Sequence, residues 1–265
     1  MRLYFNLFKN KLITNISYRM SAIAGILTQF FFGFVFISVY VAFFESGNSD
    51  LDLHKIVSYI WLNQAFYGLT YIMLKDNDFV SMIKNGNIAY ELCKPINFFK
   101  KWFSTFYGIR VANVLLKFLP IICIAMLLPY PYKLEAPVSI MGFALFVVSL
   151  IISSFLVTGI AYIFHILIFF TLDDRGIINI FQVLGEIFSG GSIPLYLFPG
   201  FLQTIAYALP FRYISDLPYN LYTGYFSINE GISLITCSII WLVVIVIIGN
   251  ILTKLALNKS VIQGG

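Results

Sequence analysis

Six long apolar blocks limit the folds open to this chain more than any other feature. A helix of about 20 apolar residues crosses the ~30 Å hydrocarbon core of a bilayer, and the blocks cover 20–44, 53–74, 102–128, 137–170, 177–193 and 231–252. Apolar residues occupy 60% of the 265 positions and charged residues 11%, whereas a soluble domain has about 25% charged residues. A large buried core would break such blocks into amphipathic stripes. The sequence therefore predicts an all-α integral membrane protein, a single domain over 1–265 with six transmembrane helices.

The basic residues predict the orientation, because Lys and Arg are retained on the cytoplasmic side. With the N-terminus inside, the outer segments contain Lys55, Lys133 and Arg212. The inner segments contain twelve basic residues, namely Arg2, Lys9, Lys11, Arg19, Lys75, Lys84, Lys94, Lys100, Lys101, Arg175, Lys254 and Lys259. Both termini are therefore expected in the cytoplasm.

Residues 1–19 are basic and amphipathic. Phe5, Phe8, Leu12 and Ile16 recur at helical spacing, which predicts an interfacial helix on the cytoplasmic leaflet. A continuation of the first span is the alternative. The apolar block that follows is too long for the hydrophobic part of a cleavable signal.

The loop 75–101 is the longest polar stretch of the chain. Asn77 or Asp78 can cap a short helix in it, and Gly86 can end that helix. Its apolar face would consist of Phe79, Met82 and Ile83. Such a helix at the cytoplasmic surface can lie on lipid or insert into a groove of a soluble partner, and the residues alone do not decide between the two.

The outer segment 194–230 is apolar but broken by prolines. Between Pro199 and Pro210, the stretch Phe201–Leu209 is too short to cross a membrane. Backbone at membrane depth must satisfy its own hydrogen bonds, so we expect a re-entrant or surface-lying helix. An ordinary extracellular loop would contain more polar residues.

Four ionisable residues fall at membrane depth, where charges are costly and usually face protein or water. They are Arg110 and Lys117, seven residues apart in the third block, His165 in the fourth and Glu186 in the fifth. One hypothesis joins Glu186 to Arg110 or Lys117 in a salt bridge or a hydrogen-bonded cluster. These residues can line a transport path or only pack between helices, and for His165 a helix–helix contact is favoured over a proton relay.

Several short patterns resemble those of permease subunits of type-2 ABC exporters (ABC-2), in a six-span bacterial subfamily. One is Ile83-Lys84-Asn85-Gly86-Asn87-Ile88 followed by Leu92-Cys93-Lys94-Pro95-Ile96. The other is Ser189-Gly190-Gly191 with Pro194, Pro199, Leu209-Pro210-Phe211 and Pro218. The order of spans, loop helix and outer breakers is also similar, over essentially the whole chain.

This resemblance implies a mechanism in which two permease chains pair around a central path. Two cytoplasmic ATPases would bind ATP and Mg and supply the energy, since this chain has no GxxxxGK[ST] phosphate loop and would bind no cofactor itself. The loop helix would be the coupling helix that docks on the ATPase, through Asp78, Phe79, Met82, Ile83, Lys84 and Gly86. Re-entrant helices would close the outer end, with Gly190, Gly191, Pro194, Pro199, Pro210 and Phe211.

The resulting expectation is a non-enzymatic subunit of an exporter in the bacterial plasma membrane, in contact with lipid and without a nucleic-acid partner. Its substrate would be amphipathic or hydrophobic, such as a drug, peptide or lipid, and the second permease chain can be identical or homologous. A secondary transporter or channel is the first alternative, and a non-transporting assembly subunit is another. A membrane enzyme is disfavoured, because two histidines and three cysteines without ligand spacing predict no metal site.

Overall fold

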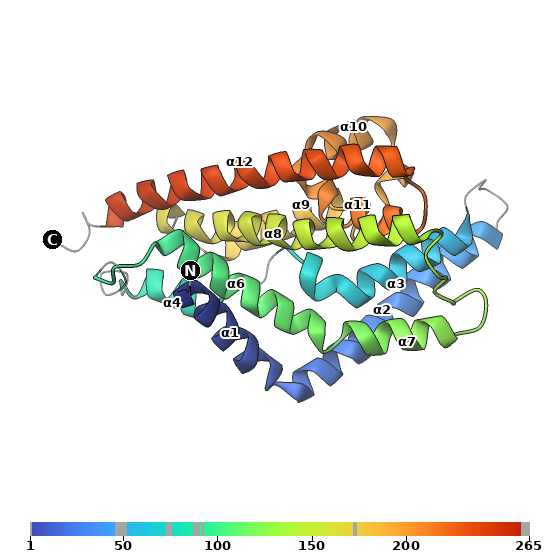
Figure 1. Cartoon of the computed structure of the whole chain (residues 1–265), viewed down its shortest axis with the longest axis horizontal. Coiled ribbons are helices and arrows are strands. Elements are labelled where there is room, and N and C mark those ends of the chain that lie inside the picture. The colour runs from blue at the N-terminus through green and yellow to red at the C-terminus, as the bar shows by residue number, and fades with distance from the viewer. Residues whose placement is uncertain are drawn as a thin grey trace.

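The protein is described by a computed structural model that covers residues 2–45, 52–72, 76–86, 91, 93–171 and 174–260. Within these ranges every regular element is a helix (Figure 1). The predicted all-α architecture is therefore confirmed. Lys75, Leu92, and Asn87 and Ile88 of the loop pattern lie outside the described residues.

Four helical stretches of the described chain are long and apolar enough to cross a bilayer. They are α2 (Arg19–Glu45), α6 with α7 (Phe98–Leu115 and Phe118–Leu127), α8 (Ile140–Thr171) and α12 (Ile228–Ser260). In Figure 1 α12 runs along α8 at the top of the bundle, and the two helices pack closely.

The expected second and fifth spans are shorter helices. α3 (Leu53–Thr70) has 18 residues and α9 (Asp174–Phe188) has 15, so at 1.5 Å per residue they are about 27 and 22 Å long. Most residues of α3 are buried by its neighbours. Neither helix meets the criteria of length and apolarity that the four long stretches meet, and six crossings remain a proposal.

The first helix, α1 (Arg2–Ile16), is separate from α2 and turns away from it (Figure 1). It packs along α6, at a point where a side chain on Gly108 would come within 2.7 Å of the Phe8 carbonyl oxygen. Phe8 also stacks on Tyr107, with 5.6 Å between ring centroids. The alternative of one continuous helix through the first span is therefore wrong.

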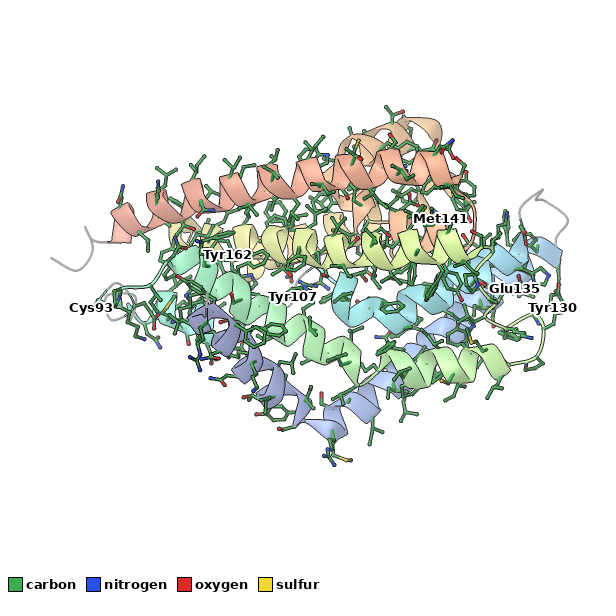
Figure 2. All side chains as sticks on the ribbon, in the orientation of Figure 1. Cys93, Tyr107, Tyr130, Glu135, Met141 and Tyr162 are labelled. Carbon is green, nitrogen blue, oxygen red and sulfur yellow. The ribbon has the colours of Figure 1, made fainter. Side chains whose placement is uncertain are left out.

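The two ends of the molecule are marked by Cys93 and Tyr130 in Figure 2. The Cys93 end contains the short helix α4 (Asn77–Lys84), the start of α6 and the last turns of α8 and α12 (Figure 1). The Tyr130 end contains the link from α7 to α8, the end of α2 and the start of α3. α4 lies at the Cys93 end, whereas the proline-broken segment lies farther along the bundle, beside α8 and α12 (Figure 1).

The segment between α9 and α12 forms four short helical pieces. They are η1 (Leu195–Leu197), α10 (Gly200–Ala208), η2 (Pro210–Tyr213) and α11 (Asp216–Tyr222). Prolines at or before the first residue set the starts of η1, α10 and η2, since proline has a helix-like φ and no N–H to satisfy. All seven residues of α11 are buried, against α3, α8 and α12.

The aromatic side chain of α4 is buried in the bundle. Phe79 is 0% exposed, and its ring lies 4.8 Å from that of Trp102, 5.5 Å from Phe106 and 5.7 Å from His165, measured between centroids. Tyr162, labelled in Figure 2, completes the enclosure from α8. The position of α4 therefore depends on α6 and α8 together.

Removal of the Phe79 ring should release α4. A buried Phe→Ala change costs about 3–5 kcal/mol, so Phe79→Ala should lower the thermal midpoint and speed amide hydrogen exchange across 77–84. Phe201→Ala is the matched control, because Phe201 is 72% exposed. Equal exchange in the two variants would contradict this account of α4.

Candidate functional site

α4 begins at a buried carboxylate. Oδ1 of Asp76 accepts hydrogen bonds from the backbone N–H of Asp78 at 2.8 Å and of Phe79 at 3.3 Å. Asp76 is therefore the N-cap, and the expectation of Asn77 or Asp78 in that role is wrong. The helix ends before Gly86, which has φ +70°, a conformation that favours glycine.

A lysine on α1 holds the start of α4. Nζ of Lys11 lies 2.6 Å from Oδ2 of Asp78 and 4.0 Å from Oδ2 of Asp76. Partial burial lowers the pKa of Lys11, but the hydrogen bond to Asp78 and the charges of Asp76 and Asp78 outweigh it, so that the pKa is raised. Ion pairs between Lys11 and the two aspartates therefore join α1 to the start of α4 at the Cys93 end.

The structure divides the six predicted docking residues into two faces of α4. Phe79, Met82 and Ile83 are buried against the bundle in this conformation, and their docking role stays a prediction. Their apolar face is already filled by α6 and α8. Asp78, Lys84 and Gly86 are exposed, together with Asn77, Ser81 and Asn85.

His165 lies beside the cap of α4. It is 0% exposed, its Nδ1 lies 2.7 Å from the Ala161 carbonyl oxygen, and the Asp76 N–H donates to its Nε2 at 3.4 Å. Its ring also packs 4.8 Å from that of Phe106. His165 of α8 thus contacts the start of α4 and α6, which is the kind of helix–helix contact expected from the sequence.

Arg110 satisfies the end of α3. It is 0% exposed, and its guanidinium donates to the carbonyl oxygens of Leu69 at 2.9 Å, of Tyr71, and of Ile72 at 3.5 Å. The last carbonyls of a helix have no partner within it, and a cation there also interacts favourably with the helix dipole. In this structure Arg110 packs between α6 and the end of α3.

Glu186 does not pair with Arg110 or Lys117. Among the described residues it makes no ion pair, and its side chain accepts one hydrogen bond, from Oγ of Ser192 at 3.3 Å. Arg110 is engaged at the end of α3, while the Lys117 ammonium lies against α2 at Gly25. The hypothesis of an ion pair is therefore wrong for this structure.

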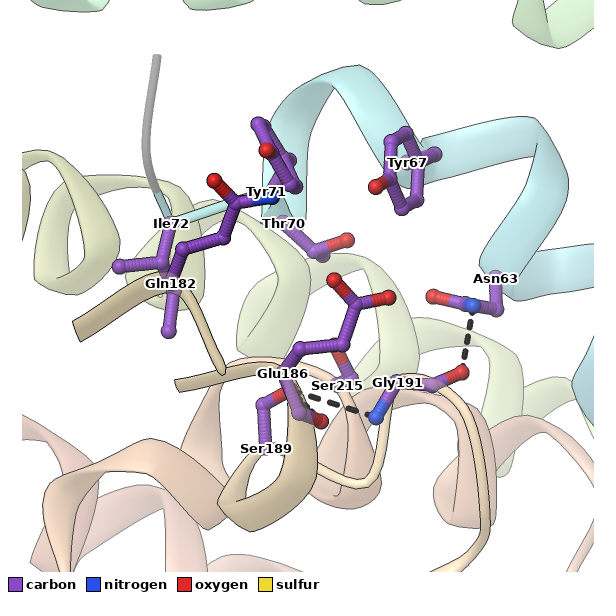
Figure 3. Close-up of a pocket in the computed structure, with 10 residues that line it drawn as sticks. All are labelled: Asn63, Tyr67, Thr70, Tyr71, Ile72, Gln182, Glu186, Ser189, Gly191 and Ser215. Atoms are coloured by element: carbon purple, nitrogen blue, oxygen red, sulfur yellow. Dashed lines mark hydrogen bonds between the residues drawn. The ribbon is translucent and has the colours of Figure 1, made fainter. Parts of the chain in front are cut away.

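Glu186 and Lys117 instead line neighbouring hollows along α3. The hollow in Figure 3 lies between α3 and α9, holds about 20 Å³ and includes Glu186, enough for a water molecule. A second hollow of about 240 Å³ also includes Glu186, and a third of about 170 Å³ includes Lys117. Tyr67 borders all three.

The turn after α9 is fixed to α3 by hydrogen bonds. The Tyr59 hydroxyl donates to the Gly190 carbonyl oxygen at 2.7 Å. Nδ2 of Asn63 donates to the Gly191 carbonyl oxygen at 2.5 Å (Figure 3). Gly190 has φ +77°, which residues with side chains rarely adopt. The backbone N–H of Asp216 donates to the Ser189 carbonyl oxygen at 3.0 Å.

The remaining predicted outer residues lie in the short helices that follow. Pro194 and Pro199 precede η1 and α10, Pro210 begins η2 and is buried, and Phe211 is half-buried. Oδ1 of Asp216 accepts from the Leu195 N–H at 3.3 Å and from Nδ2 of Asn220 at 2.8 Å, which joins η1 to α11.

Sequence reasoning missed the groups that hold these parts together: Lys11, Tyr59, Asn63, Asp76 and Asp216. A signal existed for two of them. Asn63 interrupts an apolar block and Asp216 follows a stretch poor in charges, and such residues in a membrane protein commonly have a buried partner.

Loss of the Arg110 guanidinium should destabilise the end of α3. Arg110→Leu leaves buried carbonyl oxygens without donors, at a cost of roughly 1–3 kcal/mol, which a thermal melt in detergent would detect. Arg19→Leu is the control, since Arg19 is exposed. A melt of Arg110→Leu that matches this control would refute the role given to Arg110.

A side chain at Gly190 should strain the turn. Gly190→Ala forces a left-handed conformation that costs about 1–2 kcal/mol, and its Cβ would lie 2.8 Å from the Tyr59 hydroxyl oxygen. The melting temperature should fall, whereas Gly200→Ala, where a Cβ meets nothing within 4 Å, should leave it unchanged. Equal melts would show that the turn tolerates the substitution.

Comparison with known proteins gives one family. No curated protein matches the sequence. The model of the family described as ABC-2 family transporter protein matches residues 23–264, which is nearly the whole chain and confirms the resemblance found in the short patterns. Members of this family are the membrane components of ABC transporters, with the ATPase on a separate subunit. The chain belongs to the ABC-2 family of transporter proteins.

Proposed function

We propose that this chain is the permease subunit of an ATP-driven exporter that moves an amphipathic or hydrophobic substrate out of a bacterial cell. ATP and Mg are bound by a separate ATPase subunit, and a second permease chain, identical or homologous, completes the path. Family membership supports the class of protein. The substrate type, the direction and the pairing of permeases are the parts that we add.

The observation that carries this proposal is the way α4 is held. Its inner face is fixed by Phe79, and its start is fixed by Asp76 and Lys11. Its outer face presents short polar side chains, with Ser81 and Asn85 exposed near its middle and end. A helix fixed in this way can transmit a movement of a docked ATPase to α6 and α8, because packed interiors transmit strain.

The distribution of charge supports a cytoplasmic location for the Cys93 end. Lys84 ends α4, Lys94 follows it, and Lys100 and Lys101 lie in the first turn of α6. Lys254 lies near the end of α12. Such a cluster is typical of the side on which basic residues are retained. We infer six crossings with both termini in the cytoplasm, in which α3 and α9 complete the set, α1 lies on lipid, and α10 and α11 form the outer re-entrant region.

The outer region, in this proposal, closes the far end of the path. Gly190 and Gly191 are hydrogen-bonded to α3, and the buried α11 packs on α8 and α12. A movement of α3 against α8 would therefore displace both the turn at Gly190 and Gly191 and the helix α11. This linkage is what a closure that responds to the ATPase requires.

Docking can be tested on the exposed face of α4. Ser81→Arg with Asn85→Arg should reduce the recovery of the ATPase subunit with a tagged permease at least fivefold, because two long cations replace short side chains at the contact. Asn258→Arg, at the exposed end of α12, is the control and should leave recovery unchanged. Undiminished recovery with the double variant would remove α4 from the docking surface.

A further inference from the structure

The hollow of about 240 Å³ between α2, α3 and α9 has an unusual combination of walls. Asn63, Gln64 and Tyr67 of α3 contribute polar groups, and Phe32 and Phe36 of α2 contribute aromatic rings. Among the residues that the structure describes, Glu186 is the only charged one that borders it. A mainly apolar hollow with a few convergent polar groups is the usual form of a small-molecule site.

The charge of Glu186 has no cationic partner in the described part of the chain. Its one side-chain hydrogen bond comes from the neutral Ser192 hydroxyl. A carboxylate removed from water is costly unless it is paired, and this cost is greatest at membrane depth. A cation that enters the hollow would supply the missing partner.

Lys117 does not supply it. Lys117 borders the adjoining hollow of about 170 Å³, which shares Gln29, Gln64 and Tyr67 with the larger one. The charged residue in the lining of the larger hollow is therefore an acid, Glu186, and that in the lining of the neighbouring hollow is a base, Lys117. An anion would find its partner in the neighbouring hollow and would meet Glu186 unfavourably in this one.

The aromatic rings favour an organic cation over a metal ion. Phe32 is 46% exposed, and the Phe36 and Tyr67 rings border the same space. Aromatic faces attract ammonium-like groups and also pack on an apolar body. Among His, Cys, Asp and Glu of the described residues, no group of three comes together to hold a metal ion.

We propose that this hollow is a binding site for apolar organic cations, with the positive charge at Glu186 and the apolar body against Phe32 and Phe36. The inference rests on the proposed transport function, because it names the class of substrate that the exporter would bind in this hollow. It also makes the site selective by sign of charge, which hydrophobicity alone would not do.

The test measures binding of radiolabelled tetraphenylphosphonium to the full chain in lipid nanodiscs, with the signal of empty nanodiscs subtracted. Tetraphenylborate, which has nearly the same shape and the opposite charge, is the matched ligand. We expect saturable binding of the cation and at least tenfold weaker binding of the borate. Equal affinity for the two ions, or no saturable binding of the cation, would overturn the proposal.

Two variants assign the binding to this hollow. Glu186→Gln should weaken binding of the cation at least tenfold, and Thr28→Lys should do the same by adding a positive charge at an exposed position on the rim. Lys117→Gln should leave binding within about twofold, because Lys117 does not border this hollow. Wild-type affinity in Glu186→Gln would place the cation elsewhere and refute the site.

The Thr28→Lys variant keeps the test decisive if Glu186→Gln does not fold, since it leaves Glu186 in place. The assay contains no ATPase, so its outcome is independent of docking on α4. Loss of ATPase recovery in the α4 variant together with no binding of the cation would leave the permease function intact and reject only this substrate class.

Discussion

The hydrogen bonds of Arg110 to the end of α3 are the interaction on which the central part of the molecule depends. α3 stops after 18 residues, and in an apolar surrounding its last carbonyl oxygens need donors that water does not provide. The guanidinium supplies them from α6 and is itself completely buried. This arrangement lets one helix stop inside the bundle, where an uncapped end would be too costly.

A second interruption lies beside the first. α9 stops at Phe188, and the turn after it takes its hydrogen bonds from Tyr59 and Asn63 on α3. Two helices that end within the bundle need polar neighbours, and one of these neighbours, Asn63, also lines the two hollows that contain Glu186. A side chain that supports irregular backbone thus also adds a polar group to the walls of these hollows.

The long helices could be read from the sequence because only composition and length decide them: the block 137–170 forms α8 almost residue for residue. The end of α3 could not be read, because it depends on Arg110, which is 41 residues from Leu69. The burial of Phe79, Met82 and Ile83 within the bundle could not be predicted either, because it depends on α6 and α8, which lie farther along the chain. Periodicity shows that a helix has an apolar face, but it does not show whether that face meets the same chain or a partner.

The pocket that holds Phe79 has a consequence for the order of synthesis. α4 leaves the ribosome before any of the rings that enclose it, and the last of them, Tyr162 and Phe169, come more than 80 residues later. Until α8 has been made and inserted, α4 has only its contacts with α1 and α6, and the α8 side of the Phe79 pocket is missing. A chain that is truncated or inserted only in part therefore lacks the complete Phe79 pocket. Only a chain complete through α8 can present α4 in a fixed position to an ATPase subunit.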